Sequence, residues 1–179
     1  MFDGGQLITG RATATGSLLK IGKLPVERWR DYRALRLEAL RNDPQAFGSS
    51  TREEEKLTKE DWERRIRDVL FALDDDKPVG MTVFVLNDRP KTRHVASIFG
   101  VYVSPKYRRK GLGTRLLKAA LLRIGKREGI VKVKLAVNPE QQSALRMYEK
   151  AGFVVVGRMR KELKVGRRFF DELMMEMLL

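Results

Sequence analysis

The sequence predicts a mixed α/β domain in which a central sheet carries helices on both faces. The first observation is the order of apolar patterns along the chain: a strand, two helices, three strands, a helix, a strand, a helix and two strands. The second is the stretch from His94 to Leu122, where an apolar strand leads through a glycine turn into an amphipathic helix. The third is the length of 179 residues, which suits one domain and suffices for a substantial core.

The first part of the chain predicts a short strand and a long helix. Residues 1–15 are rich in Gly, Thr and Ala and lack periodicity, so we expect a flexible segment or an accessory strand there, and a single domain over residues 16–179. Ser17–Leu24 is predicted as a strand, and Pro25 suits the start of a helix over about Val26–Arg41. The apolar side of this helix carries Trp29, Tyr32, Leu35 and Ala39.

A polar loop, Gln45–Lys56, precedes the second predicted helix. Thr58 and Asp61 have the spacing of a capping box at the start of that helix. Its apolar stripe is Trp62, Ile66, Val69 and Leu70. Two strands follow, at about Val69–Leu73 and Val79–Leu86, and the turns after them are rich in Asp, Asn and Pro.

The last third of the chain alternates between strand and helix. Val131–Val137 alternates apolar residues with lysines, which predicts a strand with one buried face. The helix that follows carries Tyr148 and ends at Gly152. The final segments, Phe153–Met159 and Asp171–Leu179, are predicted as a hairpin pair joined by a basic linker.

The turn Arg108–Thr114, with the sequence RRKGLGT, predicts an anion site. A glycine turn that opens a helix presents free backbone N–H groups and the positive end of the helix dipole. Gly111 and Gly113 let a ligand approach the main chain without a Cβ in the way. The cations of the turn are Arg108, Arg109 and Lys110. We interpret the turn as a phosphate or pyrophosphate site; the alternative is a tight connection between strand and helix without a ligand.

The composition and the motifs exclude several classes of site. The chain contains no cysteine and one histidine, which excludes disulfides, thiolate nucleophiles and zinc–thiolate centres, and we expect no metal. The turn lacks the GxxxxGK[ST] of a nucleotide P-loop, and Leu116 replaces the third glycine of the dinucleotide fingerprint. No apolar run is long enough to span a membrane and no secretory signal is seen, so we expect a cytoplasmic protein without membrane contact.

The net charge of +14 is concentrated around the turn and the helix after it. Between Ser104 and Lys134, eleven lysines and arginines accompany a single acid, Glu128. Most of these cations suit a solvated helix face, and the others suit the attraction of an anionic ligand such as coenzyme A. Nucleic-acid or ribosome contact is a third interpretation, but the run lacks interleaved aromatic residues and any nucleic-acid-binding motif.

Two longer motifs include the turn and the helix before Gly152. The first is V-Y-V-S-P-x-Y-R-R-K-G-L-G-T-x-L-L, and the second extends from Ala136 to Phe153. Both resemble motifs of the GNAT superfamily of acyl-CoA-dependent N-acetyltransferases. Arg108, Gly111 and Gly113 fill the family signature (Q/R)-x-x-G-x-(G/A). The matches to the second motif, N-x-x-A-x-x-L-Y-x-x-x-G-F, are Ala144, Met147 in place of Leu, Tyr148, Gly152 and Phe153.

The resemblance implies a mostly antiparallel sheet of six to seven strands flanked by about four helices. It also implies a bulge in the central strand, which splays the fourth strand from the fifth and opens a cleft for acetyl-CoA, the co-substrate. The expected contacts with acetyl-CoA are the main chain of Val101, Tyr102 and Val103, the Arg108 side chain, and the amides of Arg109, Lys110, Gly111, Leu112, Gly113 and Thr114. The side-chain amide that reaches the pantetheine arm is either Gln141, where the family prefers Asn, or Asn138.

The resemblance further implies that the amine attacks the thioester directly, in a ternary complex without a covalent enzyme intermediate. Tyr148 is then the expected proton donor to the departing thiolate; by its position alone it would equally suit the core. Many relatives place a glutamate base where this chain has Ser97. The substitutes are a water chain, His94 or a carboxylate from Glu53–Glu55.

We therefore expect an N-acetyltransferase that acts on a primary amine, which is a protein N-terminus, a lysine or a small-molecule amine. The alternatives are a non-catalytic acyl-CoA-binding sensor or scaffold, and an acetyltransferase of a ribosome- or nucleic-acid-associated protein. We expect Phe47–Lys56, the first two helices and Lys161–Phe170 to select the acceptor. The basic surface favours an acidic or neutral acceptor over a polycation. The sequence leaves open whether the protein is a monomer or a homodimer.

Overall fold

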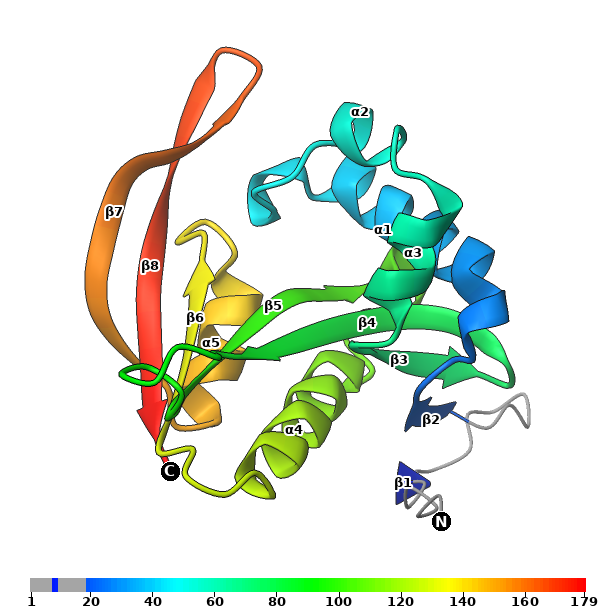
Figure 1. Cartoon of the computed structure of the whole chain (residues 1–179). Helices are drawn as coiled ribbons and strands as arrows, with labels where there is room; N and C mark the ends of the chain where they lie inside the picture. The colour runs from blue at the N-terminus through cyan, green and yellow to red at the C-terminus, as the bar shows by residue number, and fades with distance from the viewer. Residues whose placement is uncertain (1–7, 10–18) are drawn as a thin grey trace.

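The computed structural model describes residues 8–9 and 19–179 and consists of one sheet with helices on both faces (Figure 1). In chain order the elements are β1 (Ile8–Thr9), β2 (Leu19–Gly22), the 3-10 turn η1 (Val26–Arg28), α1 (Trp29–Asn42), η2 (Pro44–Ala46), α2 (Thr51–Glu54), α3 (Lys59–Ile66), β3 (Val69–Asp74), β4 (Lys77–Leu86), β5 (Val95–Val103), η3 (Pro105–Tyr107), α4 (Leu112–Gly125), β6 (Lys132–Val137), α5 (Gln142–Lys150), β7 (Val154–Val165) and β8 (Arg168–Leu178). The predicted order of strands and longer helices is confirmed from β2 onward.

The strands form a single sheet in the order β1-β2-β3-β4-β5-β6-β8-β7. β5 and β6 are parallel and the other neighbouring pairs are antiparallel, so the expected mostly antiparallel sheet is confirmed. Seven strands have four residues or more, and the eighth, β1, has two. β1 falls within residues 1–15; the rest of that segment and the predicted boundary at residue 16 lie outside the described residues.

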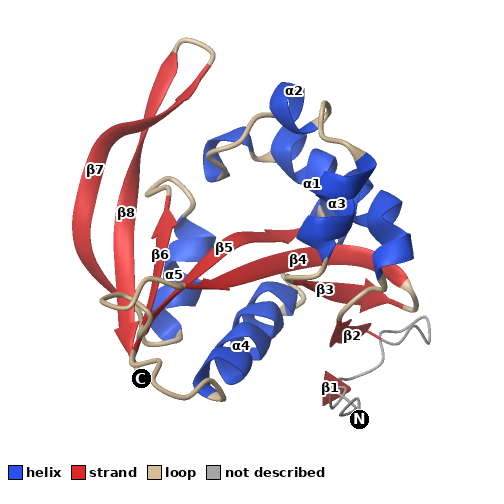
Figure 2. Cartoon of the chain, viewed as in Figure 1, coloured by secondary structure: helices blue, strands red, loops and turns tan. Residues whose placement is uncertain are grey.

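Two hydrophobic cores form, one on each face of the sheet (Figure 2). On the first face, α1 and α3 bury Tyr32 and Trp62 against Phe71 of β3, with the rings in edge-to-face contact. On the opposite face, α4 and α5 bury Leu116 and Tyr148 in a separate cluster. Because each helix has one apolar stripe, the sheet between them fixes the position of both helix layers.

Helices α2 and α3 both begin with a capping box. At α3, the Thr58 hydroxyl accepts from the Asp61 N–H at 3.2 Å and the Asp61 carboxylate accepts from the Thr58 N–H at 3.1 Å, as predicted. Ser50 and Glu53 form the same arrangement at α2. α2 is therefore a short helix inside Gln45–Lys56, which the sequence predicts as a loop, because the Ser-x-x-Glu spacing stabilises one helical turn.

Two predicted boundaries are wrong. The sequence assigns Val69 and Leu70 both to the stripe of the second helix and to the strand Val69–Leu73. The strand is confirmed as β3, and the helical assignment is wrong, because α3 ends at Ile66 and pairing with β4 overrides the helical spacing. The predicted strands Phe153–Met159 and Asp171–Leu179 are each longer at the hairpin tip and form β7 and β8.

The β7–β8 hairpin projects beyond the other strands (Figure 1). Its ladder continues to the pair Val165–Arg168, across a turn where Gly166 has a φ of 61°. The register shifts between Met159 and Leu163. Most of β7 is exposed, so both of its faces accept charged residues and the apolar alternation that would reveal a strand is lost.

A β-bulge in β5 opens the sheet beside β6. The register of β5 against β4 shifts between residues 99 and 102, where β5 has one residue more than its partner. Gly100 lies within this bulge with a φ of 61°, a conformation that a glycine adopts without strain. β5 pairs with β6 only over Val95–Ser97, and the two strands then separate. Among the strands predicted from the sequence, β5 is the fourth and β6 is the fifth, so the expected separation of these two strands is confirmed.

Replacing Leu117 of α4 by alanine is expected to lower the free energy of unfolding by about 2–5 kcal/mol, because the side chain is 1% exposed and its loss leaves a cavity. Leu122 lies on the same helix but is 48% exposed, so Leu122→Ala is expected to change that free energy by less than about 0.5 kcal/mol. Urea denaturation monitored by circular dichroism measures both. Equal losses in the two variants would contradict the orientation of α4.

Candidate active site

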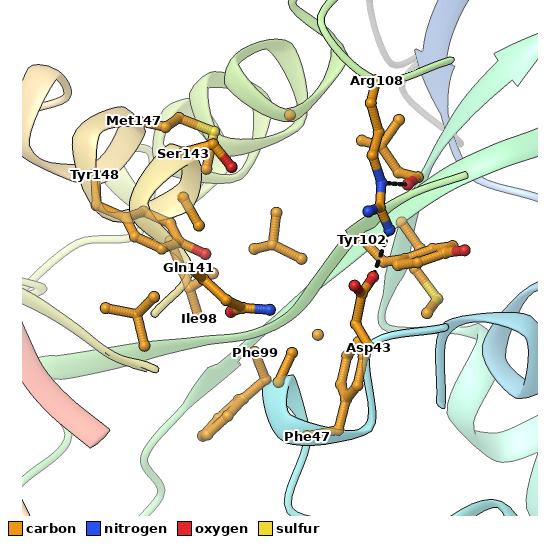
Figure 3. A pocket seen from close by; sticks show the side chains of 18 of the residues that line it. Asp43, Phe47, Ile98, Phe99, Tyr102, Arg108, Gln141, Ser143, Met147 and Tyr148 are labelled. Carbon is orange, nitrogen blue, oxygen red and sulfur yellow. Dashed lines mark hydrogen bonds and ion pairs between the residues drawn. The ribbon is translucent and has the colours of Figure 1, made fainter. Parts of the chain in front are cut away.

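The separation of β5 from β6 opens a cleft of about 1260 Å³ (Figure 3). Its walls come from segments that are far apart in the sequence. They include the loop at residues 45–49, the main chain of β5 at residues 98–103, the turn before α4, and residues around the start of α5. The cleft thus lies where the sequence predicts one.

The N-terminus of α4 faces this cleft with main-chain donors. Gly111 is the N-cap, with a φ of 75° and no side-chain cap. The first helical bond extends from the Arg115 N–H to the Gly111 carbonyl at 3.0 Å, so the amides of Leu112, Gly113 and Thr114 precede it. These three residues line the cleft, and the helix dipole adds positive potential there. The turn therefore has the donors that an anion site requires.

The two glycines of the turn meet different needs. Gly111 has open space where a Cβ would lie, so it serves the left-handed conformation of the turn. A Cβ on Gly113 would lie 3.1 Å from the Met147 sulfur, closer than ordinary van der Waals contact. Gly113 therefore lets the start of α4 pack against α5, in addition to any approach by a ligand.

The cations of the turn differ in their surroundings. Arg109 lines the cleft. Arg108 also lines it, but its guanidinium forms an ion pair with Asp43 and donates from Nε to the Val103 carbonyl at 3.0 Å (Figure 3). Lys110 lies outside the lining. Of the predicted anion-binding cations, Arg109 is thus the one in the lining for which the structure gives no ion pair among the described residues.

β5 presents main-chain groups to the cleft. Val101, Tyr102 and Val103 all line it. The Ser104 N–H donates to the Val79 carbonyl of β4 at 2.9 Å, so by antiparallel alternation Val103 directs its own main-chain groups away from β4 and toward the cleft. A ligand with amide groups fits such an edge as an added strand would.

The Tyr102 hydroxyl is bound away from this edge. It donates to the Glu38 carboxylate and accepts from the Asn42 side-chain amide, both at 2.8 Å. Burial, together with the Glu38 carboxylate, raises the pKa of Tyr102 to about 12. Tyr102 therefore contributes its main chain and ring, and not its hydroxyl, to the cleft.

Tyr148 of α5 extends its hydroxyl into the cleft (Figure 3). The residue is 6% exposed, and its ring packs edge to face on Phe153 with centroids 6.0 Å apart. Burial raises the pKa of Tyr148 well above that of a free tyrosine. The phenol is therefore protonated at neutral pH, and no described residue accepts its proton in a hydrogen bond. It is placed to donate to a ligand.

Of the two side-chain amides considered from the sequence, the structure brings Gln141 to the cleft, beside Tyr148 (Figure 3). Asn138 is buried and lies outside the lining. Its Oδ1 accepts from the Glu140 N–H at 2.8 Å, and its Nδ2 donates to the Gln45 carbonyl at 3.4 Å. Asn138 thus stabilises the turn between β6 and α5 and ties it to the loop at the cleft wall.

The residues considered as a general base lie outside the lining. His94 is exposed before the start of β5, and Ser97 is buried in the sheet. The carboxylates of Glu53–Glu55 are bound in the α2 capping box and in ion pairs with arginines. None of these positions brings a base to the cleft.

The carboxylate that the sequence reasoning missed is Glu172 of β8. Three carboxylates line the cleft, and two of them, Asp43 and Glu140, form ion pairs with arginines. Glu172 has no cationic partner among the residues that the structure describes. Burial, and then repulsion from Glu162, raises the pKa of Glu172. An unpaired carboxylate in a cleft with a raised pKa is typical of a proton acceptor.

The register of β8 explains the position of Glu172. Leu173 pairs with Val137, the last residue of β6. Glu172 is therefore the first residue of β8 beyond the end of β6, at the point where β8 borders the cleft. The sequence contains this acid at the start of the predicted last strand, Asp171–Leu179, and only the pairing of β6 with β8 reveals that it borders the cleft.

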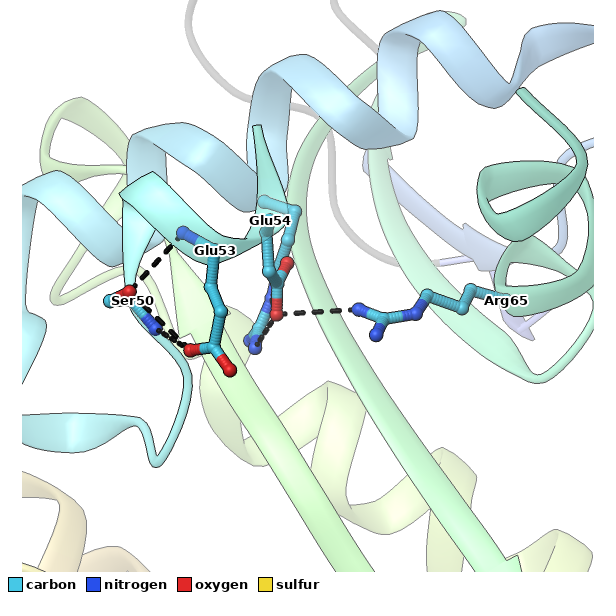
Figure 4. A network of polar contacts seen from close by, with 5 residues as sticks. Ser50, Glu53, Glu54 and Arg65 are labelled. Atoms are coloured by element: carbon cyan, nitrogen blue, oxygen red, sulfur yellow. Dashed lines mark hydrogen bonds and ion pairs between the residues drawn. The ribbon is translucent and has the colours of Figure 1, made fainter. Parts of the chain in front are cut away.

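A polar network from the helical layer forms another part of the wall (Figure 4). Arg36 and Arg65 line the cleft and both contact Glu54, at 2.8 and 3.3 Å. Burial alone would raise the pKa of Glu54, but the hydrogen bonds from Arg36 and the charges of Arg36 and Arg65 outweigh it and hold the pKa below its usual range. Glu54 is therefore a structural carboxylate.

Two further classes of feature were sought in the part of the chain that the structure describes. No helix there combines the length and the apolar character needed to cross a membrane. No three His, Cys, Asp or Glu side chains there are grouped in a way that suits a metal ion.

Comparison with known proteins gives matches over most of the chain. The acetyltransferase (GNAT) family model matches residues 31–153. Mycothiol acetyltransferase of Brachybacterium faecium is 33% identical over 114 residues, which are 59% of this chain and 34% of that protein. The chain spans less than half the length of the first curated relatives that it matches.

Solved structures share the fold. A GNAT-family acetyltransferase of Streptococcus pneumoniae has a TM-score of 0.80 at 23% identity, covering 90% of this chain and 99% of that one. An acetyltransferase of Salmonella typhimurium, solved with acetyl-CoA, has a TM-score of 0.76 at 18% identity, covering 90% and 94%. The mixed sheet with its separated strands is thus the fold of these acetyltransferases.

Asn138→Ala is expected to lower the free energy of unfolding by about 1–3 kcal/mol, because Asn138 is 1% exposed and its loss leaves the Glu140 N–H and the Gln45 carbonyl without their partner in two part-buried hydrogen bonds. Gln141→Ala removes an amide that faces the cleft and is expected to change that free energy by less than about 0.5 kcal/mol. Thermal and urea unfolding of both variants provide the measurement. A stable Asn138→Ala protein would show that these bonds do not hold the turn.

Proposed function

The chain belongs to the acetyltransferase (GNAT) family, and on this premise we propose that it transfers the acetyl group of acetyl-CoA to a primary amine in a ternary complex. The observation that carries the proposal is that a helix N-terminus with main-chain donors and a protonated phenol line the same cleft. The Salmonella protein of the same fold was solved with acetyl-CoA, which supports the choice of acyl donor.

We divide the cleft into a donor half, formed by the turn before α4 and the edge of β5, and an acceptor half, lined by Arg36, Phe47 and Glu172. In the donor half, the amides of Leu112, Gly113 and Thr114 bind the diphosphate of acetyl-CoA, and Arg109 adds charge. The pantetheine arm follows β5 as an added strand. The Val103 carbonyl already accepts a hydrogen bond from Arg108, so the Val103 N–H is the group that remains available to the pantetheine arm.

Tyr148 and Glu172 perform the proton transfers of the reaction. The amine nitrogen attacks the thioester carbon, so that a C–N bond forms and the C–S bond breaks. Glu172 accepts the proton that the amine loses, and Tyr148 gives its proton to the departing thiolate. No covalent enzyme intermediate is needed, which agrees with the absence of cysteine from the chain. The acceptor is a protein N-terminus, a lysine or a small-molecule amine.

Tyr148→Phe tests the proton donor and is expected to lower kcat by about 10²–10⁴-fold, the usual contribution of general acid catalysis. Acetyl-CoA affinity, measured by calorimetry, should change little, because the diphosphate site is intact. Thiol release with a panel of amines measures kcat. Tyr107→Phe is the matched control: Tyr107 also lines the cleft, but its hydroxyl donates to the Asp74 carboxylate at 2.6 Å.

The outcomes of these measurements separate the proposed activity from its alternatives. An unchanged rate in Tyr148→Phe would remove that residue from the mechanism. Acetyl-CoA binding without thiol release across the whole panel would instead indicate an acyl-CoA sensor. If acetyl-CoA did not bind at all, the assignment of the α4 turn would fail.

Glu172→Gln tests the proton acceptor through the pH dependence of kcat/KM. A base must be unprotonated, and burial together with Glu162 raises the pKa of Glu172, so the unaltered protein should lose activity on acidification at a higher pH than an ordinary glutamate would cause. Glu172→Gln should lower kcat/KM by about 10²–10⁴-fold and abolish this acidic limb. Glu162→Gln removes the repulsion and should move the limb to lower pH.

The control for this series is Glu176→Gln, which lies on the same strand and forms an ion pair with Lys132. It should leave the acidic limb where it is. A limb that persists in Glu172→Gln would show that another group, or water, takes the proton.

A further inference from the structure

We infer that the acceptor half of the cleft selects an amine with a carboxylate close to its nitrogen, as in a free α-amino acid, and that Arg36 binds this carboxylate. The inference rests on the proposed acetyltransferase function and narrows its acceptor. The observation behind it is that one edge of the Arg36 guanidinium has no hydrogen-bond partner among the described residues.

Arg36 projects from α1 and uses two of its three guanidinium nitrogens to bind Glu54. Nε lies 3.0 Å from Oε2 and Nη2 lies 2.8 Å from Oε1, which is the bidentate arrangement of an arginine with a carboxylate. Nη1 carries two further N–H donors. Among the described residues none accepts a hydrogen bond from it. The Arg36 side chain as a whole is 13% exposed and lines the cleft, so the access that remains to these donors is from the cleft.

The unpartnered Nη1 faces the bulge of β5. A Cβ on Gly100 would lie 3.6 Å from Nη1, and both residues line the cleft. The guanidinium also packs over the Phe47 ring, 4.7 Å from its centroid. With Glu54 on one edge and Phe47 on one face, the group is fixed in orientation. Its free donors therefore point to the place where β5 separates from β6.

The local charge balance favours an anion at this place. Arg36 and Arg65 share the single carboxylate of Glu54, which leaves one net positive charge on this wall (Figure 4). A guanidinium edge that is shielded from water gains from a carboxylate that accepts its two N–H groups. Nothing on the protein supplies that carboxylate among the described residues.

The lining of the cleft also contains the opposite charge. Glu172 lines it without a cationic partner among the described residues. A ligand that places an ammonium at Glu172 and a carboxylate at Arg36 would satisfy both groups. A lysine side chain or a protein N-terminus has an amine but no carboxylate beside it. The free α-amino acid is the class that has both, and Phe47 and Phe99 offer apolar surface for its side chain.

The test compares amines that differ only in the carboxylate. We expect kcat/KM for L-phenylalanine to exceed that for L-phenylalaninamide and for 2-phenylethylamine by about tenfold to a hundredfold, the range expected for a charged hydrogen bond. Thiol release from acetyl-CoA measures all three on the unaltered protein. Arg36→Lys keeps a cation for Glu54 but removes the free edge, and is expected to reduce the ratio of acid to amide to about one.

Arg41→Lys is the matched control, because Arg41 also lies on α1 but pairs with Glu55 at the surface. It should retain the preference for the acid. Equal or faster turnover of the amide by the unaltered protein, or a preference that survives in Arg36→Lys, would overturn the inference while leaving acetyl transfer itself in place. Turnover of lysine peptides but not of amino acids would overturn it as well. Absence of thiol release with every amine would instead count against the proposed function.

A second measurement avoids the variant altogether. 3-Phenylpropionate should compete with the amine acceptor more strongly than 3-phenylpropionamide, because only the former presents a carboxylate to Arg36. Equal inhibition by the two compounds would contradict the inference even if Arg36→Lys failed to fold.

Discussion

The cleft exists because two neighbouring strands stop pairing. β5 and β6 share a ladder over Val95–Ser97 only, and the bulge at Gly100 then turns β5 away. A sheet interior normally satisfies its main-chain donors and acceptors within the ladder. Here the interrupted ladder leaves an inner edge of β5 facing a cavity. A ligand with its own amide groups can form hydrogen bonds along that edge in the way that a neighbouring strand would.

The two helix layers place different chemistry on either side of this gap. The layer of α4 and α5 brings the main-chain donors of the turn and the buried phenol of Tyr148, and Gly113 lets the two helices touch beside Met147. The layer of α1 to α3 brings Arg36 and its partner Glu54. Because separate cores hold the two layers to opposite faces of the sheet, side chains of both layers reach one cleft only where the sheet opens.

The sequence predicts the part of the site that is local. The glycine turn, Tyr148 and the order of elements depend on spacings within a few residues, and the structure brings the turn and Tyr148 to one cleft. The sequence does not decide whether Asn138 or Gln141 faces the cleft. The structure does, because Asn138 bonds the Gln45 carbonyl and Gln141 lines the cleft. Glu172 could not be found, because its place depends on the register of β8 against β6. The same limit applies to Arg36, whose partner Glu54 comes from another helix.

β7 is the last strand of the sheet and, with twelve residues, its longest. An open strand of this length would invite a second sheet to extend it and form aggregates. The register shift between Met159 and Leu163 breaks the ladder near its middle, and Lys161 and Lys164 place charges around the break. These are the devices that keep an exposed sheet margin from recruiting another chain. β7 thereby has features that oppose pairing with another strand, although no helix in the described part of the chain covers it.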